Sequence, residues 1–187
     1  PGTEQIQLNE ETVWGGSPYT NANPNALNIL PKVREMIFNG QEEEAEKLIG
    51  ENFYTRKHGM PFQTIGSLLL NFPGHDTYKD YYRELDLQTA IATVRYQVDG
   101  ITYTRTVFTS FTDNAVMMLI EADKPGKISF TANYTTPFKD YSVSKKGNSL
   151  VLSGKGSDHE GVPGAIRFEN HVQVKTEKGK SKVHNDK

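Results

Sequence analysis

The sequence predicts a mainly β protein, a large antiparallel sandwich of two sheets with a short helical hairpin near its N-terminus. Three observations support this class. After residue 65 the chain consists of short segments rich in Val, Ile, Thr, Tyr and Phe, separated by turn residues about every ten positions. Asp99-Gly100 joins two such segments and is a strong signal for a two-residue hairpin. Between residues 26 and 53, by contrast, apolar residues recur with the helical period.

The first elements along the chain are a short strand and a loop. Residues 4–8 alternate polar and apolar, with Ile6 and Leu8 on one face, which is typical of a half-buried strand. The loop that follows contains Trp14, the only tryptophan, among Gly, Asn and Pro residues. A lone tryptophan is more often a core residue than a ligand platform, but the glycines beside it permit a close approach of another molecule.

A hairpin of two helices is expected as an insertion over about residues 27–53. In the first helix the apolar positions are Leu30, Val33, Ile37 and Phe38. Pro31 is expected in its first turn, where a missing N–H is harmless, and Gly40 is expected to end it. The second helix begins with acidic residues, which the helix dipole favours at an N-terminus.

The rest of the chain is expected to form strands, with a second hairpin around residues 145–149. The expected strands are 66–72, 91–98, 101–110, 114–122, 127–135, 141–146, 149–154 and 165–177. No internal repeat or low-complexity linker divides the sequence, so we expect a single domain over residues 1–187. The chain starts without methionine and ends in a charged segment, from which we expect a truncated piece of a longer protein.

Composition argues against several classes of function. The formal net charge of −2 provides no positive field for nucleic acid, and the longest apolar runs, 65–70 and 115–120, are too short to span a membrane. The absence of cysteine excludes disulfides, thiolate metal sites and a cysteine nucleophile.

Three regions carry candidate chemistry. Residues 75–86 contain four carboxylic acids together with Tyr78, Tyr81 and Tyr82, which could form a sugar platform, although a polar connection between sheets is the favoured interpretation. Asp158, His159 and Glu160, with His171 further on, are ligand-type residues, but consecutive side chains rarely converge on one ion, so no metal site or cofactor is assigned. His58 lies on an expected surface loop, where it could face a ligand or only solvent.

Four blocks in order resemble one family. They are "QIQLNEETVWGGSP" (5–18), "LPKVREMIFNGQEEEAEKL" (30–48), "PFQTIGSLLLNF" (61–72) and the segment 81–119 that includes "YQVDGITYTRTVF". They are similar to the N-terminal domain of glycoside hydrolase family 95, the α-L-fucosidases. The resemblance covers residues 4–135 well and the remainder loosely.

The resemblance implies a supersandwich-like domain that precedes an (α/α)₆ helical barrel. In that family the barrel carries the catalytic residues of an inverting hydrolysis of α-L-fucosides, so no catalytic residue is assigned to this chain and it is expected to be inactive alone. The implied partners are the barrel of the same parent chain and a fucosylated oligosaccharide. The implied location is periplasmic or secreted, with any signal peptide upstream of Pro1. Trp14 and His58 are then candidates for the barrel interface or the rim of its sugar pocket.

Two alternatives stay open at this point. The chain could be a stand-alone carbohydrate-binding module that uses Tyr78, Tyr81 and Tyr82, or a self-sufficient hydrolase that uses its own carboxylates. A flat row of exposed tyrosines would favour the binding module, whereas an apolar face without a cover would favour the scaffold of a larger enzyme.

Overall fold

The computed structural model describes residues 1–55 and 59–184, which divide into two compact units. The first unit comprises Pro1–Leu8, Gly66–Thr136 and Gln173–Val183. The second comprises Asn9–Ile65 and Pro137–Val172, together with His184. The single domain expected over residues 1–187 stays a prediction.

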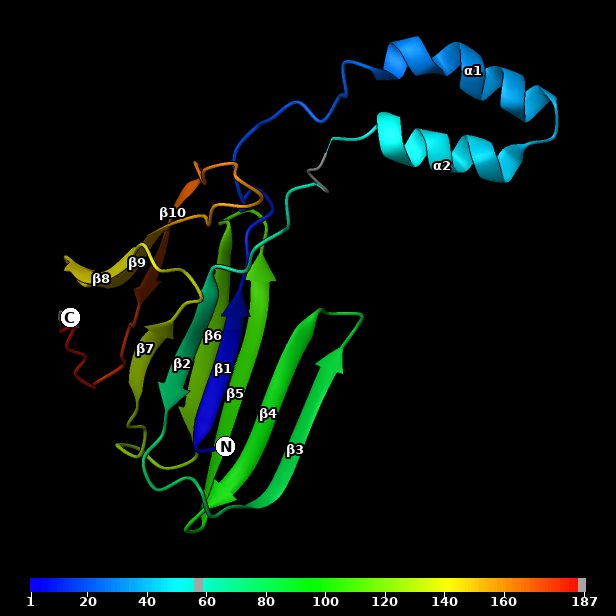
Figure 1. Ribbon diagram of the computed structural model, residues 1–187. Helices are drawn as coiled ribbons and strands as arrows, with labels where there is room; N and C mark the ends of the chain where they lie inside the picture. Colours follow the sequence, from blue (N-terminus) through cyan, green and yellow to red (C-terminus); the bar gives the residue numbers. More distant parts are fainter. Residues whose placement is uncertain (56–58, 185–187) are drawn as a thin grey trace. The chain divides into compact units, whose positions relative to one another are not determined.

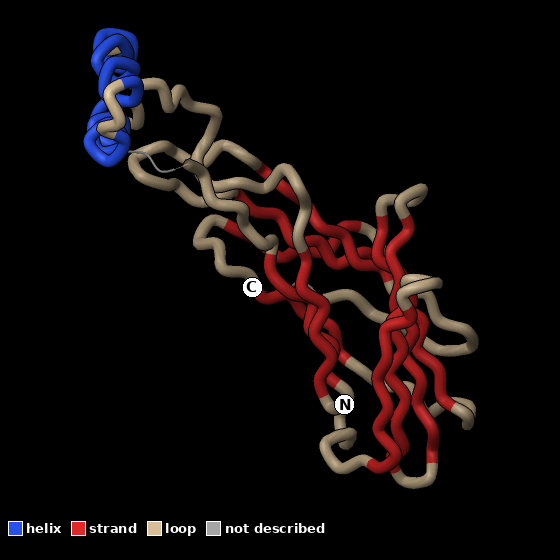
Figure 2. Tube along the Cα trace, turned by 90° about the vertical axis from the view of Figure 1, so that its right-hand side faces the viewer, coloured by secondary structure: helices blue, strands red, loops and turns tan. Residues whose placement is uncertain are grey.

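Two antiparallel sheets form the first unit (Figure 1). The three-stranded sheet has the order β1-β2-β7, with β1 at Thr3–Leu8, β2 at Gly66–Asn71 and β7 at Thr131–Thr135. The four-stranded sheet is the meander β3-β4-β5-β6, with bounds Lys79–Asp86, Ile91–Val98, Ile101–Ser110 and Ala115–Ala122. Figure 2 shows the strands of this unit as two layers.

Alternating residues of the four-stranded sheet build the core of the first unit. Val94, Tyr96 and Val98 of β4 are buried together with Ile101 and Tyr103 of β5. They occupy one face of the sheet because side chains alternate between faces along a strand. The Tyr96 and Tyr103 rings stack with their centroids 5.5 Å apart.

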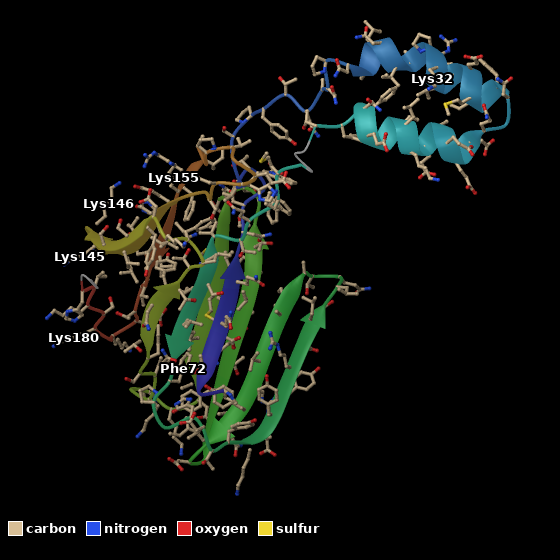
Figure 3. The ribbon with its side chains drawn as sticks, in the orientation of Figure 1. Lys32, Phe72, Lys145, Lys146, Lys155 and Lys180 are labelled. Carbon is tan, nitrogen blue, oxygen red and sulfur yellow. The ribbon has the colours of Figure 1, made fainter. Side chains whose placement is uncertain are left out.

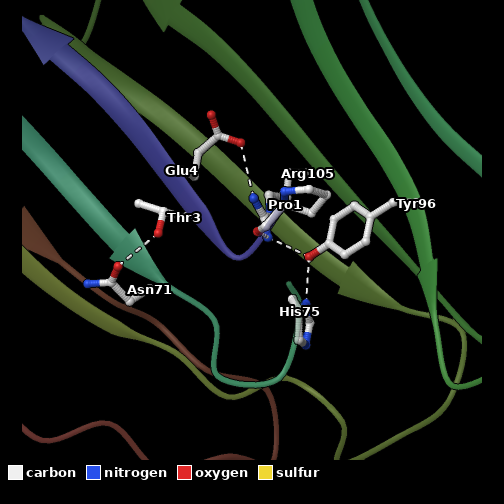
Figure 4. Close-up of polar contacts among 7 residues, drawn as sticks. All are labelled: Pro1, Thr3, Glu4, Asn71, His75, Tyr96 and Arg105. Atoms are coloured by element: carbon white, nitrogen blue, oxygen red, sulfur yellow. Dashed lines mark hydrogen bonds and ion pairs between the residues drawn. The ribbon is translucent and has the colours of Figure 1, made fainter. Parts of the chain in front are cut away.

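A buried cation joins the two sheets of this unit (Figure 4). Arg105 of β5 is 1% exposed, and its Nη1 donates a hydrogen bond to Glu4 Oε2 of β1 at 3.1 Å. Its Nη2 donates to the carbonyl of Pro1 at 2.6 Å and to the Tyr96 hydroxyl. The guanidinium carbon also lies 3.7 Å from the centre of the Phe72 ring, an attractive cation–π position. Arg105 Nε alone has no hydrogen-bond partner among the described residues.

The second unit contains the helical hairpin and a third antiparallel sheet. Helix α1 spans Ala26–Phe38 and packs against α2, Glu42–Asn52. The sheet has the order β10-β9-β8, with β8 at Tyr141–Lys146, β9 at Ser149–Lys155 and β10 at Arg167–Gln173. Leu150, Val151 and Leu152 of β9 are buried, and the Phe168 ring of β10 packs on Phe138 at 5.1 Å. Among the described residues, neither helix is long and apolar enough to cross a membrane.

The expected class is confirmed: the protein is mainly β, its sheets are antiparallel and a helical hairpin lies near the N-terminus. Both expected hairpins form. Asp99 and Gly100 have φ angles of 50° and 70°, the positive pair that a type I′ turn requires. β8 and β9 pair from Lys146↔Ser149 outward, with Gly147 in the turn.

Three local expectations were wrong. Pro31 lies inside α1, which begins at Ala26, so its ring removes a bond that an N–H would have made to a carbonyl four residues earlier. The segment 75–86 is not a connection, because Lys79–Asp86 forms β3. The expected strand 127–135 begins only at Thr131, after the turn residues of 123–126 and four residues of irregular chain.

β3 was missed because it carries no apolar alternation. All of its residues are exposed, and it is an edge strand paired only with β4. A β-bulge between Lys79 and Tyr82 places one extra residue on β3, and Asp80 has a φ of 51°. The strand therefore forms through backbone hydrogen bonds to β4 and not through burial of apolar side chains.

Candidate functional site

Three loops of the second unit meet around Trp14. Backbone bonds join the first two loops: Gly15 N donates to Pro61 O at 2.8 Å, and Gln63 N donates to Val13 O at 2.9 Å. Between these bonds Trp14 and Phe62 form an isolated antiparallel bridge. The two aromatic residues are thus held opposite each other by backbone pairing.

The third loop, residues 156–165, closes on the glycines beside Trp14. Gly16 N donates to Ser157 O at 2.8 Å, and Ala165 N donates to Gly16 O at 3.0 Å. Gln63 Oε1 accepts a hydrogen bond from Ser157 N at 3.1 Å. We call this arrangement of residues 11–18, 59–65 and 156–165 the Trp14 loop cluster.

Two glycines beside Trp14 lie in tight surroundings. A Cβ on Gly15 would stand 3.1 Å from Pro61 Cγ. Gly16 has a φ of +66°, and a Cβ there would stand 2.5 Å from the sulfur of Met60. The sequence "WGGSP" therefore serves a close packing of loops within this chain, whether or not another molecule approaches it.

Trp14 is fixed in position but not covered. Its indole Nε1 donates to Glu11 O at 2.8 Å, and its ring meets Phe62 edge-on, with centroids 5.5 Å apart and an interplanar angle of 71°. Val13, the preceding residue, is 1% exposed, whereas Trp14 is 46% and Phe62 is 42% exposed. Because successive side chains point to opposite sides of the extended backbone, Val13 is buried. Trp14 and Phe62 form a half-exposed aromatic pair on the surface of the second unit.

The acidic residues near the cluster have structural partners. Asp158 Oδ1 accepts a hydrogen bond from Gly164 N at 2.8 Å. His159 and Val162 exchange backbone bonds of 3.0 and 2.8 Å around a turn in which Glu160 has a φ of 44°. This stretch is thus a hairpin turn that the hydrogen bond to Asp158 stabilises. His159 lies beside Gly15. Within residues 1–55 and 59–184, no three His, Asp or Glu residues are grouped as metal ligands would be.

His171 does not join Asp158, His159 and Glu160. Its Nε2 lies 2.9 Å from Glu169 Oε2 on the same strand, β10. The hydrogen bond from His171 is the main cause that lowers the pKa of Glu169, and the nearby Lys146 charge adds to it.

The candidate tyrosines belong to the first unit. Tyr78, Tyr81 and Tyr82 are 44%, 46% and 53% exposed. The rings of Tyr78 and Tyr81 lie 5.6 Å apart but are inclined by 56°. The Tyr82 hydroxyl donates to Glu84, a bond that raises the pKa of Tyr82. Because the first two rings are not coplanar, one flat ligand cannot stack on both.

The remaining candidate, His58, lies outside the described residues. Phe62 is the partner that sequence reasoning missed. No periodicity links it to Trp14, since the two residues meet only through backbone bonds between distant loops.

The whole chain matches a family of carbohydrate-active domains. Residues 1–187 match the family model described as "Glycosyl hydrolase family 65, N-terminal domain". The chain therefore belongs to this family of N-terminal glycoside hydrolase domains.

Curated relatives are named as fucosidases. The chain is 31% identical to "Alpha-L-fucosidase 2" of Arabidopsis thaliana over 160 residues, 81% of this chain and 18% of the relative. It is 33% identical to "Probable alpha-fucosidase A" of Aspergillus oryzae over 118 residues, 59% of this chain and 16% of the relative. A protein of the same name from Aspergillus niger is 27% identical over 160 residues, 81% of this chain and 20% of the relative.

The expected resemblance to the N-terminal domain of a glycoside hydrolase is confirmed. The matching family model carries the number 65, whereas the sequence blocks indicated family 95, and the fucosidase names of the relatives agree with that resemblance. The chain spans no more than a fifth of the length of these relatives.

Proposed function

We propose that this chain is the non-catalytic N-terminal domain of an enzyme that hydrolyses α-L-fucosides. The observation that carries the proposal is the match of all 187 residues to an N-terminal glycoside hydrolase domain, together with relatives that are named fucosidases and are several times longer. In this proposal a downstream helical (α/α)₆ barrel carries out an inverting hydrolysis. The enzyme acts in the periplasm or outside the cell on a fucosylated oligosaccharide.

Exposed apolar side chains support the scaffold role. On the outer face of β5 and β6, Phe108, Met117 and Leu119 are each at least 40% exposed, and Phe108 pairs directly with Met117. On α1, Leu27 and Phe38 are 76% and 82% exposed. Apolar groups gathered on a surface in this way are typical of faces that another domain covers.

In this proposal the Trp14 loop cluster faces the barrel. An aromatic pair held by backbone bonds is a rigid platform, and the C–H face of a sugar packs well on such rings. The buried position that would exclude this role for Trp14 is not found, because nearly half of its surface is exposed. Trp14 and Phe62 would then form part of the rim of the sugar pocket.

The test compares this chain with the longer enzyme that the proposal predicts, using 2′-fucosyllactose as substrate. We expect no free fucose from the 187-residue chain, and release of β-L-fucose from the longer protein, seen by NMR before mutarotation. Trp14→Ala in the longer protein is expected to lower kcat/KM about tenfold, equivalent to roughly 1.4 kcal/mol of transition-state stabilisation. Phe111→Ala is the control, because Phe111 is fully exposed in the β5–β6 turn of the other unit.

Two results would contradict the proposal. Release of fucose by the 187-residue chain would place catalysis within it. An equal loss of kcat/KM in the Trp14→Ala and Phe111→Ala proteins would show that the Trp14 loop cluster is not part of the sugar pocket.

A second candidate function is sugar binding by the chain itself through the exposed tyrosines. The exposure of Tyr78, Tyr81 and Tyr82 favours this function. Because the rings of Tyr78 and Tyr81 are inclined by 56°, a sugar unit would stack on only one of them. Saturation transfer from the 187-residue chain to 2′-fucosyllactose, lost in Tyr81→Ala, would support this function.

A further inference from the structure

A groove of about 350 Å³ lies against the sheet β8-β9-β10. Its lining includes Tyr141 and Ser142 from β8, Ser153 and Lys155 from β9, and Arg167 and Glu169 from β10. All of these residues belong to the second unit. Figure 3 shows Lys146 and Lys155 on the same sheet. We call this feature the β8–β10 groove.

The shape of the groove follows from strand register. Tyr141 pairs with Gly154 and Ser142 pairs with Ser153. A Cβ on Gly154 would stand 2.5 Å from the Phe168 ring. Because the ring lies against the backbone at this position, a side chain larger than that of glycine would clash with it. Ser142 and Ser153 are small, so short hydroxyl-bearing side chains line the groove between the longer charged ones.

Glu169, one of the two acidic residues that line the groove, has basic partners of its own. Glu169 Oε2 lies 3.7 Å from Lys146 Nζ and 2.9 Å from His171 Nε2, and Ser153 Oγ donates to Glu169 Oε1 at 3.4 Å. The negative charge of Glu169 therefore has partners at the edge of the groove, and its carboxylate does not pair with Lys155 or Arg167.

Lys155 and Arg167 bring two positive charges to the same groove. Neither makes an ion pair in the described part of the chain. The Lys155 backbone N donates to Asp140 O at 3.0 Å, which places the carboxylate-bearing Asp140 at the rim. An Arg side chain offers a planar fork of donors that matches a carboxylate, and a Lys ammonium adds a point charge.

The lining therefore combines the groups that an acidic sugar needs. Arg167 and Lys155 suit its anionic group, and the serine hydroxyls and Asp140 suit its hydroxyls. We propose that the β8–β10 groove binds a carboxylate-bearing saccharide, such as a uronic acid unit of a glycan chain. This site is separate from the Trp14 loop cluster and does not depend on the proposed fucosidase activity.

The test measures binding of trigalacturonate and of neutral galactotriose to the 187-residue chain by isothermal titration and saturation-transfer NMR. Trigalacturonate is expected to bind and galactotriose to bind at least about tenfold more weakly, because only the first carries carboxylates that form charge-paired hydrogen bonds with Arg167 and Lys155. The double variant Arg167→Gln/Lys155→Gln is expected to lose about tenfold or more in affinity for trigalacturonate for the same reason.

The matched control is the double variant Lys32→Gln/Arg95→Gln, which removes the same charges from α1 and β4. Its affinity is expected to stay within about twofold of the unmodified chain, since exposed charges elsewhere act only through a screened field. Circular dichroism establishes that each variant is folded. Three results overturn the proposal: no binding of trigalacturonate, equal binding of the two trisaccharides, or an equal loss in the control variant. None of these depends on fucose release, so the two proposals fail independently.

Discussion

Arg105 and Glu4 form an ion pair between the two sheets of the first unit, with Nη1 3.1 Å from Oε2 and the arginine side chain 1% exposed. β1 and β5 are far apart in the sequence and do not pair with each other, so this contact links one sheet to the other through side chains alone. A buried charge must be compensated, because its transfer from water is costly. Glu4, the Pro1 carbonyl and the Tyr96 hydroxyl provide that compensation.

Removal of the carboxylate is therefore expected to destabilise the protein. Glu4→Gln leaves the buried guanidinium without its counter-charge and is expected to lower the free energy of unfolding by about 3 kcal/mol. Urea denaturation measures the change. Glu121→Gln on the exposed face of β6 is the control and is expected to change stability by less than about 0.5 kcal/mol. Equal effects of the two substitutions would show that the ion pair contributes nothing specific.

The same network makes stability depend on pH through His75. His75 Nδ1 lies 2.8 Å from the Tyr96 hydroxyl, and burial, followed by the Arg105 charge, lowers the pKa of His75 below 6.5. The unfolded chain then binds a proton more readily than the folded chain, so stability increases with pH in this range. The contribution is fully present above pH 6.5 and is lost as pH falls below that value.

Urea midpoints measured at a series of pH values across 6.5 test this dependence. The unmodified chain is expected to lose stability as the buffer is acidified from pH 6.5, and His75→Gln is expected to lose less over the same interval. NMR titration of the His75 ring gives its pKa directly. A pKa at or above 6.5 would contradict the prediction.

Replacement of two glycines by alanine is expected to change the free energy of unfolding in opposite directions. Gly66 begins β2 with a φ of +139°, and a Cβ there would stand 2.9 Å from Thr136 Cα and closer still to the Thr135 carbonyl. Gly66→Ala is therefore expected to cost at least about 1–3 kcal/mol of unfolding free energy. Gly50 lies in α2 with open space around it, so Gly50→Ala is expected to stabilise by up to about 1 kcal/mol. Thermal and urea unfolding check both values, and a stabilised Gly66→Ala protein would show that the backbone at β2 relaxes freely.

Local signals in the sequence predict much of this fold. The Asp99-Gly100 turn and the β-branched segments around it place β4 and β5 at Ile91–Val98 and Ile101–Ser110, the bounds that the structure shows. The helical hairpin follows from periodicity in the same way. β3 does not, because its exposed residues leave no apolar pattern and its strand exists only through pairing with β4.

The candidate site is harder to predict from the sequence than the fold. Trp14 is singled out by its glycine-rich loop, but Phe62 and residues 156–165 join it through backbone bonds between segments far apart in the chain. The β8–β10 groove likewise depends on register, which brings Ser142 beside Ser153 and Lys146 and His171 close to Glu169. Residue types alone do not reveal such pairings.

Trp14 also provides an optical test of the proposed enzyme architecture. It is the only tryptophan of the chain and is 46% exposed, so its fluorescence in the 187-residue chain is expected to be readily quenched by acrylamide. If a barrel domain covers the Trp14 loop cluster, quenching of this residue falls severalfold in the longer protein, measured with any further tryptophan replaced by phenylalanine. Phe62→Ala removes the edge-on contact at 5.5 Å and is expected to raise the quenching constant in the 187-residue chain, since one side of the indole loses its cover. Equal quenching of Trp14 in the short and long proteins would leave this aromatic pair facing solvent, and the proposed contact between the cluster and the barrel would be wrong.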